Sequence, residues 1–194
     1  MCSWCWGISP QLNALHRYSQ EKASPFSLVM GGLRAGGGDV WNTKFKNFLK
    51  HHWEEVAKRS GQPFSDALLN QDNFNYDTEP ACRAIVTVRN LSPHKVLRFY
   101  ELFQHSFYVE SNDPKELVFY EPICKKLGID FTNFSQKFIS QEMKEATQKD
   151  FAKSRSIGAS GFPSVIYRKK DTIQFITRGY ATYESMKASL EAMD

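Results

Sequence analysis

Cys2-Ser3-Trp4-Cys5 stands at the start of this chain, within the stretch Met1-Cys2-Ser3-Trp4-Cys5-Trp6, and it opens an expected helix. Two thiols at this spacing can close a small disulfide ring. The first turn of a helix carries unpaired backbone N–H groups and the positive end of the helix dipole, which stabilise a thiolate. The pair therefore indicates thiol–disulfide exchange, in which Cys2 attacks and Cys5 resolves the mixed disulfide.

Other uses of paired cysteines have further requirements. A haem attachment site needs a histidine directly after the second cysteine, and Trp6 stands there instead. A structural zinc site usually needs a second pair of ligands, whereas Cys82 and Cys124 each stand alone. No metal site is expected, although the spacing of the pair by itself leaves zinc open as an alternative.

Composition narrows the class of protein. The chain has 194 residues with 25 basic and 21 acidic side chains, so its formal net charge is +4. The basic residues are spread along the expected helices, which argues against a nucleic-acid partner. A run of about 18 apolar residues is absent from the sequence, so a membrane partner is not expected. Four cysteines at this length do not make a disulfide scaffold, and no signal peptide precedes Cys2, so we expect a cytoplasmic protein.

The first part of the chain combines one strand with a long helical stretch. A helix is expected over 10–20, and the apolar run 26–30 is expected to form a short buried strand. From 41 to 140 the apolar spacing is helical throughout, with helix starts at Ser92-Pro93 and Asp113-Pro114. These hundred residues are most simply described as an all-helical insertion.

The last part of the chain is expected to fold as helix, hairpin and helix. A helix with a polar face covers 141–156. Two β-branched runs, 164–167 and 172–177, flank a charged turn and predict a β-hairpin. An amphipathic helix over 183–193 follows.

A proline at the start of the hairpin is the second indication of a thioredoxin-like fold. Gly161-Phe162-Pro163-Ser164 leads into the first hairpin strand. A cis bond before Pro163 would expose the Phe162 backbone beside Cys2, where a substrate peptide could pair with it as an added strand. Most X-Pro bonds are trans, but the conjunction with the cysteine pair favours cis here. Trp4, between the cysteines, is the expected apolar contact for substrate.

With these motifs the chain resembles the DsbA-like thiol–disulfide oxidoreductases of the thioredoxin superfamily, and most closely their FrnE-type cytoplasmic branch. The stretches that carry the resemblance are 2–7, 77–84 and 158–163. It implies an α/β fold in which a thioredoxin-like domain, 1–40 and 141–194, is interrupted by the α-helical insertion domain 41–140. It also implies that Cys2 is the nucleophile, that Cys5 resolves and that Pro163 is cis.

The chain departs from that family at two points. The best-known periplasmic members have a histidine between the cysteines, whereas this chain has Ser3-Trp4; without the imidazole charge we expect a weaker oxidant. Thioredoxin-like folds also have a central strand that leads into the redox helix, and only Met1 precedes Cys2. We therefore expect that this strand is missing here and that the natural chain begins upstream. Its loss would leave ladder groups of the neighbouring strands unpaired, at about 1–3 kcal/mol for each buried group.

The expected function is a protein disulfide reductase or isomerase that exchanges disulfides with protein or small-molecule thiols. No cofactor is expected, and glutathione is a candidate co-substrate. Two alternatives stay open: a glutathione-dependent, kappa-like transferase or isomerase, which the complete cysteine pair disfavours, and a non-catalytic thiol- or metal-binding module. Cys82 and Cys124 are expected to be small core residues, and His51-His52 with Glu54-Glu55 a solvated surface.

Overall fold

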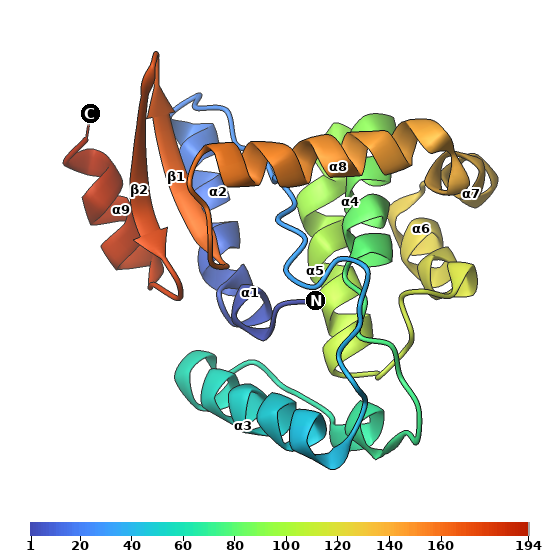
Figure 1. Ribbon diagram of the computed structural model, residues 1–194. Coiled ribbons are helices and arrows are strands. Elements are labelled where there is room, and N and C mark those ends of the chain that lie inside the picture. The colour runs from blue at the N-terminus through green and yellow to red at the C-terminus, as the bar shows by residue number, and fades with distance from the viewer. Residues whose placement is uncertain (194) are drawn as a thin grey trace.

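A computed structural model describes residues 1–193 of the chain (Figure 1). Its helices and strands follow in the order α1 (Ser3–Gly7), α2 (Ser9–Glu21), α3 (Thr43–Ser60), the 3-10 helix η1 (Asp66–Asn70), α4 (Glu79–Leu91), η2 (Pro93–Lys95), α5 (Val96–Tyr108), η3 (Leu117–Tyr120), α6 (Glu121–Leu127), α7 (Phe131–Ile139), α8 (Gln141–Ser156), β1 (Ser164–Lys169), β2 (Thr172–Arg178) and α9 (Tyr183–Glu191). This is the expected thioredoxin-like fold with a helical insertion.

The hairpin and the helical insertion lie on opposite sides of α1. Strands β1 and β2 pair antiparallel, with an irregularity between Val165 and Ile166, and α2 and α9 accompany them (Figure 1). Helices α4 to α7 form the other side, and α8 runs from the hairpin across α4 to α7. The N-terminus and α1 therefore lie between the two halves of the molecule.

Each half has its own buried cluster of apolar side chains. The smaller cluster joins α2 to the hairpin and α9 and consists of Ile8, Leu12, Leu15, Tyr18 and Met186. The larger one fills the insertion and is rich in aromatic rings, among them Trp53, Phe99, Phe107, Tyr120 and Phe134. Helix α8 contributes Met143 and Phe151 to this larger cluster. The division of the chain into two domains stays a prediction.

Capping groups account for several helix boundaries. The Asp130 carboxylate accepts backbone N–H groups at the start of α7, and the Ser140 hydroxyl does so at the start of α8. Gly61 ends α3 and Gly128 ends α6, both with the positive φ that glycine tolerates best. The helix predicted over 141–156 is confirmed at both ends.

The two predicted helix starts fare differently: helical turns do begin at Pro93, although as a 3-10 turn, whereas at Asp113-Pro114 the chain makes only a turn. At Ser92-Pro93 the chain first makes the 3-10 turn η2, the Ser92 side chain makes no capping hydrogen bond, and α5 begins only at Val96. At Asp113-Pro114 the Asp113 carboxylate accepts the Lys115 N–H and closes a local turn. Because that turn uses the capping group, the α-helix is delayed to α6.

The expected strand over 26–30 is also absent from the described structure, where β1 and β2 form a two-stranded sheet. Side chains take the place of a neighbouring strand: Arg89 donates to the Leu28 carbonyl oxygen at 2.6 Å, and the Met30 N–H donates to the Asp150 carboxylate at 2.9 Å. The segment is therefore held by hydrogen bonds from side chains of α4 and α8.

Within residues 1–193, no helix combines the length and the apolar character that crossing a membrane requires.

Candidate redox site

Cys2 and Cys5 lie together at the start of α1. Cys2 is the residue before the first helical turn, and its carbonyl oxygen accepts the N–H groups of Cys5 at 3.1 Å and Trp6 at 3.2 Å. Both cysteines are free thiols, and their sulfurs hydrogen-bond to one another. The structure thus brings the predicted pair into contact on one helical turn.

The two sulfurs have opposite acid–base properties. The hydrogen bond from the Cys5 thiol is the largest influence on Cys2, and with the backbone N–H groups of Cys5 and Trp4 it lowers the pKa of Cys2 to about 7, although burial opposes it. Donation of that same hydrogen bond, together with burial, raises the pKa of Cys5 well above its usual range. At neutral pH, Cys2 is partly thiolate while Cys5 stays a thiol.

The proline loop lies against the nucleophile, although the two are 160 residues apart. The Phe162–Pro163 bond is cis, and the Cys2 thiol is 3.5 Å from the carbonyl oxygen of Phe162. The sequence prediction of a cis bond beside Cys2 is therefore confirmed. The roles of Phe162 and Pro163 in substrate binding stay predictions.

Gly31 fixes the position of the Phe162 ring. A Cβ atom at Gly31 would stand 1.9 Å from the ring, far inside van der Waals contact, so the ring packs directly on the glycine backbone. Gly31 belongs to the segment that Arg89 and Asp150 hold. A series of contacts therefore connects the Arg89–Asp150 pair, through Gly31, to the Phe162 backbone beside Cys2.

Gly31→Ala is expected to lower disulfide-reducing activity roughly 10- to 100-fold, because the displaced Phe162 ring moves the adjoining backbone relative to Cys2. The matched control is Gly161→Ala in the same loop, where the added Cβ meets no described atom within 4 Å and the φ is not positive. Initial rates with a chromogenic disulfide check this, with circular dichroism to show that both variants fold. Equal activities of the two variants would contradict the assigned contact.

The two tryptophans of the motif face different surroundings. Trp4 is half-buried, and its ring centroid lies 6.2 Å from that of Tyr180, in the segment between β2 and α9. Trp6 is buried, donates from Nε1 to the Pro63 carbonyl oxygen and stacks on Tyr108. Trp4 as a contact for substrate stays a prediction, and Trp6 belongs to the core.

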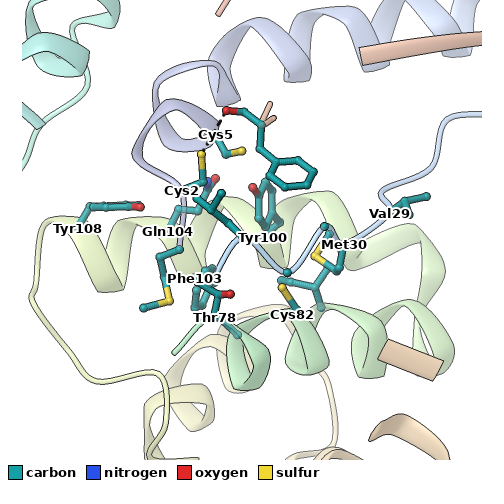
Figure 2. A pocket seen from close by; sticks show the side chains of 17 residues that line it. Cys2, Cys5, Val29, Met30, Thr78, Cys82, Tyr100, Phe103, Gln104 and Tyr108 are labelled. Atoms are coloured by element: carbon teal, nitrogen blue, oxygen red, sulfur yellow. Dashed lines mark hydrogen bonds between the residues drawn. The ribbon is translucent and has the colours of Figure 1, made fainter. Parts of the chain in front are cut away.

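A cavity of about 100 Å³ lies beside the pair, between α1, α4 and α5 (Figure 2). Its walls are mostly apolar, and the side chains with polar or thiol groups are those of Cys2, Cys5, Thr78, Cys82, Tyr100, Gln104 and Tyr108. Tyr100 forms a hydrogen bond with the Cys5 side chain, and the Gln104 side chain is buried with no described partner for its Oε1. Sequence analysis missed both residues, although their spacing of four places them on one face of α5.

The two remaining cysteines do not join the pair. Cys82 lines the far side of the cavity from α4, and burial raises its pKa to about 11. Cys124 is fully buried in the larger core, and burial raises its pKa to about 12. Both are therefore thiols at neutral pH. In the part of the chain that the structure covers, no group of three His, Cys, Asp or Glu side chains is placed to hold a metal ion.

The family model of the DSBA-like thioredoxin domain matches residues 1–190. The chain belongs to this family. Among solved structures, a candidate protein disulfide isomerase from Nitrosomonas europaea is 32% identical, with a TM-score of 0.86, 99% of this chain covered and 92% of the other. No curated protein matches the chain.

Less similar solved structures share the fold. The cytosolic disulfide reductase DsbM from Pseudomonas aeruginosa is 21% identical and superposes with a TM-score of 0.80, covering 100% of this chain and 94% of that one. A second structure of DsbM contains glutathione and superposes with a TM-score of 0.76 at the same identity and coverage. These likenesses agree with the resemblance expected from the motifs 2–7, 77–84 and 158–163.

Proposed function

We propose that this protein is a thiol–disulfide oxidoreductase that reduces or isomerises disulfides through Cys2 and Cys5. The observation that carries the proposal is the contact between the Cys2 sulfur, whose pKa is lowered, and the backbone of the cis-proline loop. Membership of the DSBA-like family supports the same chemistry, as do relatives described as a disulfide isomerase and a disulfide reductase.

The proposed reaction has two steps. The Cys2 thiolate attacks one sulfur of a substrate disulfide, so a Cys2–substrate S–S bond forms and the other substrate sulfur leaves as a thiolate. Cys5 then loses its proton and attacks the Cys2 sulfur, which forms the Cys2–Cys5 disulfide and releases the second substrate thiol. The substrate gains two electrons and the protein loses two. Two equivalents of a low-molecular-weight thiol return the protein to its dithiol form.

Small thiols and protein thiols are the proposed partners, with glutathione as the first candidate co-substrate. The glutathione-containing structure of DsbM supports this choice, and the description of DsbM as cytosolic supports a cytoplasmic site of action. A reducing compartment would drive the cycle toward disulfide reduction or isomerisation. The kappa-like glutathione transferase or isomerase is the weaker candidate, because it would leave the hydrogen-bonded cysteine pair without a role.

A turnover assay tests the proposal. Purified protein with glutathione as reductant is expected to accelerate reduction of both a small chromogenic disulfide and a disulfide-bonded protein such as insulin. Alkylation of the protein with iodoacetamide before the assay is expected to abolish that acceleration. A rate equal to that of glutathione alone would overturn the proposed function.

The pH dependence of Cys2 alkylation gives a second check. Because the thiolate is the reactive form, the rate should rise from pH 5 upward, reach half of its maximum near pH 7 and level off above pH 8. Cys5→Ala removes the hydrogen bond that lowers the pKa of Cys2, so the midpoint should move up toward the usual value of about 8.5. Mass spectrometry of quenched time points measures both midpoints. Identical midpoints in the two proteins would contradict the assigned cause.

A further inference from the structure

The resolving sulfur, Cys5, lies in surroundings that do not favour its charged form. The cavity beside it is mostly apolar, and none of the described residues that line it has a side chain of full formal charge at neutral pH other than the cysteine pair itself. The hydrogen bond with the Cys2 side chain, burial and the charge of the Cys2 thiolate raise the pKa of Cys5 well above its usual range. In the proposed reaction, however, Cys5 must become a thiolate in order to attack. The Met1 amino group lowers the pKa of Cys5, but a neutral hydrogen-bond donor lowers it more.

Helix α5 supplies such a donor. Tyr100 lies on the face of α5 that is turned toward α1, and its hydroxyl points toward the cysteine pair (Figure 2). Tyr100 lowers the pKa of Cys5 as a hydrogen-bond donor does, while burial first, and then the charges of Cys5 and Cys2 and this same interaction, raise the pKa of Tyr100. These two directions fit a phenol O–H that donates to sulfur and keeps its proton while the sulfur becomes charged.

Other polar groups of the cavity are less suited to this role. Tyr108, two turns further along α5, has a buried hydroxyl with no hydrogen-bond partner among the described residues, and it is not among the groups that shift the pKa of Cys5. The Cys82 sulfur comes from α4 and stands apart from the pair (Figure 2). Among the side chains of the insertion that line the cavity, Tyr100 is the one that lowers the pKa of Cys5.

We propose that Tyr100 is a catalytic residue of the resolving step, whose phenol O–H donates to the Cys5 sulfur and stabilises it as a thiolate. The inference rests on the proposed function and assigns part of the reaction to the helical insertion. When Cys5 attacks, the Cys2–Cys5 bond forms, the Cys2–substrate bond breaks, and the departing substrate sulfur takes up a proton to replace the one that Cys5 lost. When a reducing thiolate attacks Cys2 of the oxidised protein, Cys5 leaves with the bonding pair. Tyr100 keeps its proton in both directions.

The rates of attack by Cys2 and of resolution by Cys5 can be measured separately with a symmetric aromatic disulfide whose thiolate absorbs light. Reduced protein should release the first thiolate when Cys2 attacks and the second when Cys5 resolves. In Tyr100→Phe the first release is expected to stay within about twofold of wild type, whereas the second slows roughly 10- to 100-fold, the usual effect of losing a hydrogen bond to a charged group. Tyr108→Phe, which removes a buried hydroxyl from the same helix, should leave both releases unchanged.

A variant whose phenol is a stronger hydrogen-bond donor distinguishes a chemical role of Tyr100 from a role in packing. Incorporation of 3-fluorotyrosine at position 100 makes the phenol a stronger donor with little change of shape, so the second release should become faster than in wild type. A purely structural role of Tyr100 would not produce this acceleration. If Tyr100→Phe fails to fold, the fluorotyrosine variant by itself tests whether Tyr100 acts as a hydrogen-bond donor in the resolving step.

The outcomes distinguish this inference from the proposed function. A wild-type protein that releases no thiolate faster than free glutathione would overturn the proposed function. A wild-type protein that releases two thiolates, with the second release unchanged in both the phenylalanine and the fluorotyrosine variants, would overturn the role of Tyr100 alone.

Discussion

Cys5→Ser is expected to accumulate a covalent mixed disulfide between Cys2 and its substrate, and Cys2→Ser is expected to accumulate none. The first variant keeps the attacking thiolate but lacks the sulfur that resolves the intermediate, whereas the second lacks the nucleophile. Turnover should fall about 10³-fold or more in Cys2→Ser, as is usual when a nucleophile is removed. Acid-quenched samples analysed by mass spectrometry would reveal the adduct and its position.

Cys124→Ala is the matched control for loss of a thiol. Cys124 is fully buried in the larger core, and burial raises its pKa to about 12, so it should contribute nothing to the exchange reaction. This variant should turn over substrate like the wild type. An adduct on Cys82 or Cys124 in the Cys5→Ser variant, in place of Cys2, would contradict the assignment of the nucleophile.

Asp150→Ala is expected to lower the free energy of unfolding by about 3 kcal/mol, at the lower end of the range for a broken buried ion pair because Arg89 is partly exposed. Asp150 accepts two hydrogen bonds from the Arg89 guanidinium, each 2.8 Å long, and a third from the Met30 N–H. Its side chain is only 9% exposed, against 28% for Arg89. Loss of the carboxylate leaves both the guanidinium and the Met30 N–H without this partner.

Urea unfolding followed by circular dichroism measures this effect. The control is Glu142→Ala, which removes the exposed partner of Lys137 and should change the free energy of unfolding by at most about 0.5 kcal/mol. A loss below about 1 kcal/mol in Asp150→Ala would contradict the view that this pair replaces a strand partner of 28–30. Activity of the folded fraction should also fall, because the same segment supports Phe162 through Gly31.

The motifs that could be predicted from the sequence are those whose chemistry lies in a few adjacent residues. The cysteine pair and the proline loop carry their own signals, and together they predicted a contact between segments 160 residues apart. The helix over 141–156 was predictable because Ser140 caps it locally. These parts of the fold need no knowledge of the tertiary structure.

The wrong strand prediction and the missed site residue both depend on contacts between segments that are distant in the sequence. The run 26–30 has the composition of a strand, but its backbone groups bond to Arg89 and Asp150, which are about 60 and 120 residues away along the chain. Tyr100 stands among the aromatic residues of an apolar helix, where composition suggests only packing. Its role depends on which face of α5 meets α1, and the helical pattern of the insertion does not specify that orientation.

Equilibration in glutathione buffers of graded redox potential, followed by acid quench, alkylation and peptide mapping, tests the central claim most directly. We predict one reversible transition in which Cys2 and Cys5 become linked to each other, while Cys82 and Cys124 remain alkylatable thiols throughout. A protein whose Cys2 and Cys5 never link, or whose reversible disulfide includes Cys82 or Cys124, would contradict the account.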